Sequence, residues 1–167
     1  RTEFGLLIVE ATEAMISDSE ATEVTRGWIR NGPEEILRQR DGLTLDGQAL
    51  GTLITAMAKL LPPPEPARID RMWLEATRER HVPTADLFGI LAVDDPDDRA
   101  SQVACGRVWQ RMHLLATAHG VAIHPMNQVV ERAAREEAVG LESDFGRRLA
   151  EWTGSGRGLL CFRAGMP

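Results

Sequence analysis

The stretch that most constrains the fold is DLFGILAVDD, residues 86–95, a continuous apolar run between acidic residues. An apolar run of this length without polar residues in alternation is typical of a strand that is covered on both faces. We therefore expect a strand at 86–95 that is buried on both sides.

A long helix is expected directly after this strand. The acidic segment DDPDD, residues 94–98, offers Asp95 as a cap, Pro96 at the first helical position, and further acids that complement the helix dipole. The helix is expected from about Pro96 to His119, with Gly120 ending it. We expect its apolar stripe to consist of Ala104, Val108, Met112, Leu115 and Ala118. The acids are interpreted as a cap and not as a metal site, because they lack the alternating ligand spacing of a calcium loop.

The remaining pattern places helices before this strand and a mixture of strands and helices after the long helix. A short strand is expected at 121–123, helices at 127–138 and 142–152, and a final apolar strand at 158–167. Upstream, helical spacing or caps predict helices at 4–15, 19–29, from Pro33, at 49–61 and at 67–81. This order predicts an α+β fold with a thin sheet, which suggests an incomplete half that a partner or a missing segment completes.

We expect residues 1–167 to form a single domain. The proline-rich PPPEP, residues 62–66, cannot lie inside a helix. We interpret 62–84 as a lid or crossover segment and not as a domain boundary.

Composition limits the classes of function. The formal net charge is −6 and there is no basic run, which argues against nucleic-acid binding. The two cysteines, Cys105 and Cys161, form no C-x-x-C pair, and the histidines have no companion at metal spacing. No apolar run is long enough for a membrane span. A cytoplasmic protein without a metal fits these features. The chain begins with Arg1 and not with Met, so we also consider it a fragment.

Two segments together resemble a known family. GRVWQRMHLLATAHGVAIHPMNQVVE, residues 106–131, resembles the flavin-dependent nitroreductases, in which a long core helix is followed by a short strand and a proline-containing loop. LLCFRAGMP, residues 159–167, resembles their last core strand. WIRNGPEEILRQRDGLTLDG, residues 28–47, is similar to the Acg-type branch of NAD(P)H nitroreductases. The resemblance covers about residues 5–167 and corresponds to the C-terminal part of an Acg-type protein.

The resemblance implies a nitroreductase-like α+β fold, FMN as cofactor, and a homodimer or a fused pseudo-dimer half. It implies ping-pong hydride transfer from NAD(P)H through the flavin to nitroaromatic or quinone-like acceptors, with no catalytic side chain assigned. The proline loop would lie along the flavin ring, where backbone N–H groups would face its N5 and O4 edge and Met126 would make an apolar contact. The cofactor-binding residues implied in this way are His124, Pro125, Met126, Asn127, Gln128 and Arg163.

Alternatives remain beside this interpretation. Pro-Met-Asn also fits a plain strand-to-helix turn. The residues that hold the FMN phosphate in the family fall outside this sequence; Arg107, Arg111 and Arg163 are the nearest cations by family position, and we interpret them mainly as members of surface or interface ion pairs. A non-catalytic flavin-sequestering or regulatory protein of the Acg type is the second hypothesis. A flavin-free interaction module is the third.

Overall fold

The chain is α+β, as the sequence predicts. The computed structural model describes residues 2–30, 32–48, 51–60 and 64–166. Contacts between residues divide the chain into two compact units. Unit 1 contains residues 1–15 and 73–167, and unit 2 contains residues 16–72. A single domain over 1–167 stays a prediction.

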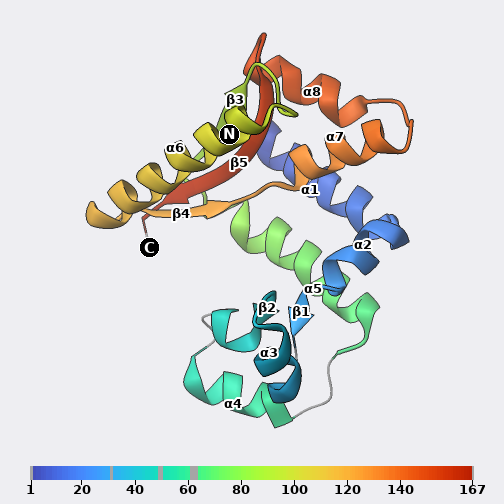
Figure 1. Cartoon of the computed structure of the whole chain (residues 1–167), viewed down its shortest axis with the longest axis vertical. Coiled ribbons are helices and arrows are strands. Elements are labelled where there is room, and N and C mark those ends of the chain that lie inside the picture. Colours follow the sequence, from blue (N-terminus) through green and yellow to red (C-terminus); the bar gives the residue numbers. More distant parts are fainter. Residues whose placement is uncertain (1, 31, 49–50, 61–63, 167) are drawn as a thin grey trace. The chain divides into compact units, whose positions relative to one another are not determined.

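Unit 1 is built on a three-stranded antiparallel sheet (Figure 1). Its strands are β3 (Leu87–Val93), β4 (Ala122–Pro125) and β5 (Arg157–Gly165), in the order β3-β5-β4. The central strand β5 is the strand expected at 158–167, and it holds both neighbours in register. Gly89 of β3 lies opposite Phe162, and His124 of β4 lies opposite Arg163.

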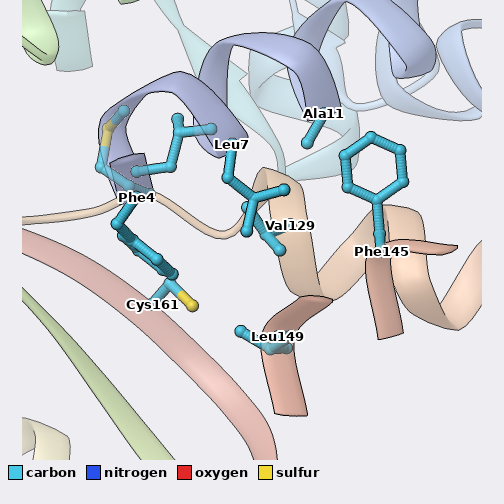
Figure 2. Packing of buried hydrophobic residues seen from close by; sticks show 9 residues of the cluster. Phe4, Leu7, Ala11, Val129, Phe145, Leu149 and Cys161 are labelled. Carbon is cyan, nitrogen blue, oxygen red and sulfur yellow. The ribbon is translucent and has the colours of Figure 1, made fainter. Parts of the chain in front are cut away.

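One face of this sheet carries the core of unit 1. The helices α1 (Thr2–Ser17), α7 (Gln128–Ala138) and α8 (Asp144–Thr153) contribute to it, together with β5. Figure 2 shows the side chains that meet there, which include Phe4, Leu7, Ala11, Val129, Phe145, Leu149 and Cys161. The apolar residues that recur at helical spacing over 4–15 therefore form the side of α1 that faces the core. Burial of these side chains supplies the main favourable free energy of the unit, since apolar burial contributes about 25 cal/mol per Å².

The long helix α6 (Arg99–Ala118) begins later than predicted, and Asp98 caps it in place of Asp95. The Asp98 carboxylate accepts the Ser101 N–H at 2.8 Å. The Asp95 carboxylate instead accepts the Asp97 N–H at 2.9 Å, within the turn that precedes the helix. Gly120 follows the helix with φ +71°, as expected for a residue that ends it in the left-handed region.

The faces of α6 and β3 are more exposed than the sequence predicts. Cys105 is the buried residue of α6, whereas Val108 and Leu115 of the expected stripe are 47% and 62% exposed. Trp109 packs against Phe162 of β5 at a ring-centroid distance of 5.5 Å. Strand β3 is not fully covered either, because it lies at the edge of the sheet and its Leu87 is 49% exposed. The expectation of burial on both faces is therefore wrong for β3.

Unit 2 is mostly helical. Its elements are α2 (Ser19–Arg26), β1 (Ile29–Arg30), α3 (Pro33–Gln39), β2 (Leu43–Thr44), η1 (Leu45–Gln48), α4 (Thr52–Leu60) and the first part of α5 (Pro66–Ala76). Asp18 caps α2 as predicted, by accepting the Ala21 N–H at 3.2 Å. The helix ends at Arg26 and not at Ile29, since Ile29 and Arg30 form a short parallel pair with β2.

The proline-rich segment leads into helical structure. Residues 62–63 of the predicted 62–84 lid or crossover lie outside the described residues. After Pro64, α5 continues into one π-helical turn, η2 (Thr77–His81), which belongs to unit 1. A lid or crossover role for 62–84 stays a prediction. Single π-helical turns are frequently found at functional sites.

Candidate functional site

The proline loop predicted to face a flavin is partly absorbed into the fold of unit 1. His124 and Pro125 are the last residues of β4, so Pro125 ends a strand and does not lie in a free loop. The Met126 amide N–H donates to the Cys161 carbonyl oxygen at 2.8 Å, and the Met126 side chain is only 1% exposed. This corrects the role expected for Met126: its amide and its side chain both serve the core.

Asn127 is the N-cap residue of α7, but its side chain does not cap that helix. The Asn127 Oδ1 atom turns back to β5 and accepts the Cys161 N–H at 2.9 Å. Burial raises the pKa of the neighbouring Glu131 carboxyl, and a hydrogen bond with the Asn127 side chain opposes that rise. The first turn of α7 therefore lacks the side-chain acceptor that its N–H groups would normally have.

Gln128, the first residue of α7, is buried, with 6% of its surface exposed. Its Oε1 atom has no hydrogen-bond partner among the described residues. A buried amide oxygen without a partner costs about 1–3 kcal/mol. Gln128 is thus an unsatisfied acceptor beside the strand end that carries His124.

Arg163 is held by hydrogen bonds to three residues from other parts of unit 1. Its Nη1 atom donates to the His81 carbonyl oxygen at 3.0 Å and to the Thr84 Oγ1 atom at 2.9 Å. Its Nε atom donates to His124 Nδ1 in a long hydrogen bond of 3.4 Å. Within the described ranges, neither Arg163 nor Arg107 nor Arg111 forms an ion pair. The surface ion pairs expected for these arginines are therefore not formed in the part of the chain that is described, whereas interface ion pairs with a partner stay a prediction.

Two histidines lie beside this guanidinium. The rings of His81 and His124 are 5.5 Å apart between centroids and meet edge to face. Burial, followed by the nearby charge of Arg163, lowers the pKa of His81 to about 4. The same two causes, in the same order, lower the pKa of His124. Both rings are thus neutral near pH 7.

A hollow of about 350 Å³ opens where β4 and β5 meet the segment after η2. We call it the Arg163 hollow. Its lining includes Thr84, Ala122, His124, Arg163, Gly165 and Met166. Two other hollows lie between α7, α8 and the start of β5 and between α6 and β3. The arginine of the first, Arg157, is paired with Glu137, and the second has no arginine in its lining. The Arg163 hollow therefore combines space with a guanidinium that has no carboxylate partner.

The sequence did not indicate His81 or Thr84 as parts of this site. The Arg163 contact with His81 spans 82 positions and the contact with His124 spans 39, so no local motif contains them. The resemblance identifies His124 and Arg163 but carries no counterpart for the η2 turn. The local sequence around His81 gives no indication either, since a lone histidine next to an arginine is ordinary on an exposed helix.

The described parts of the chain give no sign of a metal centre or a membrane span. Within them, no group of three His, Cys, Asp or Glu side chains is placed to hold a metal ion. No helix in these ranges is both long and apolar enough to cross a bilayer. Comparison with protein-family models, with curated proteins and with solved structures finds no match to this chain.

Proposed function

We propose that this chain is an FMN-dependent NAD(P)H oxidoreductase of the nitroreductase type, with unit 1 providing part of the flavin site. The observation that carries the proposal is the end of strand β4. There, Pro125 leads into a helix start without a side-chain cap. His124 of β4 and Arg163 of β5 lie opposite each other on these paired strands, and both line the Arg163 hollow.

The side chains present fit one electron-rich edge of a flavin. The volume of the Arg163 hollow lies at the low end of the range of ligand pockets, about 300–1,000 Å³. A positive guanidinium and free helix N–H groups favour negative charge, which reduced flavin carries. His124 and Arg163 line the hollow and would hold the cofactor. Asn127 and Gln128, which the resemblance also implies, do not line it, and the Asn127 Oδ1 atom already accepts the Cys161 N–H. Met126 does not fit, because its amide already bonds to Cys161.

Bound FMN would supply the hydride chemistry, accepting electrons from NAD(P)H and passing them to nitroaromatic or quinone-like acceptors. The contribution of this chain is then binding and electrostatics. Arg163 holds a positive charge at the hollow, and the neutral His124 presents a ring N–H. Such preorganised donors stabilise developing negative charge without reorganisation.

A second nitroreductase-like half, from another copy or from a fused segment, is part of the same proposal. Its support is α6, where several large apolar side chains are exposed in the described part of unit 1. These are Val103, Val108, Leu114 and Leu115, which are between 47% and 62% exposed. Large apolar side chains exposed in such number on one helix are consistent with an interface.

A specific observation favours a second candidate, a flavin-sequestering protein without turnover. In this chain the Met126 N–H is not available as a donor to a ring, so one expected stabilising contact with reduced flavin is missing. Binding without efficient reduction would follow from such a site. The two candidates differ only in whether NAD(P)H reduces the bound flavin.

The test is an absorbance scan of the purified chain between about 350 and 500 nm, the range of flavin absorption, before and after anaerobic NADPH. Yellow protein that NADPH bleaches supports the oxidoreductase. Yellow protein that NADPH leaves unchanged supports the sequestering protein. Colourless protein whose melting temperature does not change when FMN is added contradicts both candidate functions, since a ligand that binds the native state raises the melting temperature. Arg163→Gln should weaken FMN binding, whereas Arg157→Gln on the same strand should not.

A further inference from the structure

The Arg163 guanidinium is held in place by neutral groups. A carbonyl oxygen, a hydroxyl oxygen and an imidazole nitrogen accept three of its N–H groups. Arginine has five N–H donors, so the two on Nη2 are left over. Because no carboxylate among the described residues neutralises the guanidinium, its charge faces the hollow that it lines.

The contact with Arg163 also fixes the state of His124. Its Nδ1 atom accepts a hydrogen bond, so that nitrogen carries no proton, and the proton of the neutral ring sits on Nε2. Arg163 and His124 both line the hollow, and the N–H groups that these two side chains have left to donate are those on Nη2 and Nε2. A ligand that only accepts hydrogen bonds and carries negative charge would satisfy both.

His81 adds a group that can respond to such a ligand. Its Nδ1 atom is buried and has no hydrogen-bond partner among the described residues. The positive charges of Arg163 and Arg80 both disfavour its protonation, after burial as the first cause. The acid at this end of the sheet, Asp86, accepts the Met166 amide N–H at 3.1 Å and does not line the hollow.

We propose that the Arg163 hollow binds a small oxyanion, such as a phosphate, sulfate or carboxylate group, through Arg163 and His124, and that a proton is taken up by the His81–His124 pair on binding. Burial is the first cause of the lowered pKa values of His81 and His124, and the charge of Arg163 is the second. A bound anion offsets that second cause, so it raises the pKa of the rings and favours proton uptake. Affinity then rises as the pH falls. This inference stands on the side chains of the hollow and does not require a flavin.

The experiment uses the full chain and sulfate, whose charge stays constant between about pH 5 and 8, unlike that of phosphate. Histidine ring signals are followed by NMR during a sulfate titration. Saturable shifts of His81 and His124 are expected, with a dissociation constant that falls by up to about tenfold per pH unit if one proton is taken up. Arg163→Gln should abolish the shifts. The matched control is Arg157→Gln, which removes an exposed arginine of the same strand that pairs with Glu137.

Three outcomes would overturn the inference: no saturable shift in the native chain, equal sulfate affinity in Arg163→Gln, or an affinity that does not change with pH. The histidine titration of the native chain, with and without sulfate, keeps the test valid even where a variant fails to fold. Inorganic phosphate and acetate in parallel titrations show which oxyanion class binds more tightly. FMN that fails to displace sulfate would contradict the proposed function and leave the oxyanion site intact.

Discussion

Gly89 of β3 leaves the space that the Phe162 ring of β5 occupies, and its replacement by alanine should destabilise the fold. A Cβ atom at this position would lie 2.2 Å from Cζ, 2.6 Å from Cε1 and 2.9 Å from Cε2 of the Phe162 ring on β5. All three distances are far below van der Waals contact. The ring has little room to move, because it is buried and also packs against Trp109 of α6.

The expected magnitude combines two opposed effects. Overpacking of this kind costs about 1–3 kcal/mol. Replacing glycine in a strand interior gains back about 0.5–1 kcal/mol through reduced backbone entropy of the unfolded chain. We therefore expect Gly89→Ala to lower the free energy of unfolding by up to about 2.5 kcal/mol, the difference between these two effects.

A double-mutant cycle with Phe162→Leu tests this reasoning. The smaller side chain gives the new Cβ room, so the double variant should be more stable than the sum of the single changes predicts, by about 1 kcal/mol or more. Urea unfolding followed by tryptophan fluorescence and circular dichroism provides the free energies. Single costs that add within about 0.5 kcal/mol would refute the claim that the Phe162 ring is what excludes a side chain at Gly89.

Three further outcomes are expected from residues of unit 1. Stability should fall as the pH drops from 6.5 towards 4, because unfolded His81 takes up a proton in that window and the folded form, with its pKa of about 4, does not. His81→Gln should lose less stability over the same window in urea titrations. Asn127→Ala should cost about 1–3 kcal/mol in the same assay, since it removes the acceptor of the Cys161 N–H at 2.9 Å. Cys161, which is fully buried with its pKa raised to about 12, should resist a thiol reagent in the native chain, and rapid labelling would contradict its placement.

The strands and most helices of unit 1 could be predicted from the sequence, but their exposure could not. The apolar run DLFGILAV predicts a strand, but it does not distinguish a central strand from an edge strand. The strand order β3-β5-β4 places it at an edge. The same limit applies to the apolar stripe of α6, because periodicity shows that a stripe exists but not whether anything covers it. The choice of Asp98 over Asp95 as cap depended on how the preceding turn closes. All four aspartates of the segment 94–98 have the same side-chain chemistry, so the sequence alone could not decide between them.

The candidate site was predictable only in part, for a similar reason. His124 and Arg163 were identified through the resemblance, and the register of β4 with β5 places them opposite each other. His81 and Thr84 come from a segment far away in the chain, so their contribution depends on tertiary contacts. Met126 shows the opposite case, a residue that the resemblance assigns to the flavin but that the fold uses elsewhere. Its side chain is buried in the core, and its amide N–H donates to the Cys161 carbonyl oxygen.

The position of β5 in the sheet has a consequence for biosynthesis. Strands β3 and β4 each pair with β5 and not with one another, yet both are synthesised before it. At about 5–20 residues per second, the ribosome needs several seconds to progress from the end of β3 to the end of β5. During that interval β3 lacks the strand with which it pairs, and the core side of α1 lacks the part of its cover that β5 provides. Nascent chains of this protein should therefore depend on chaperones until β5 emerges from the exit tunnel.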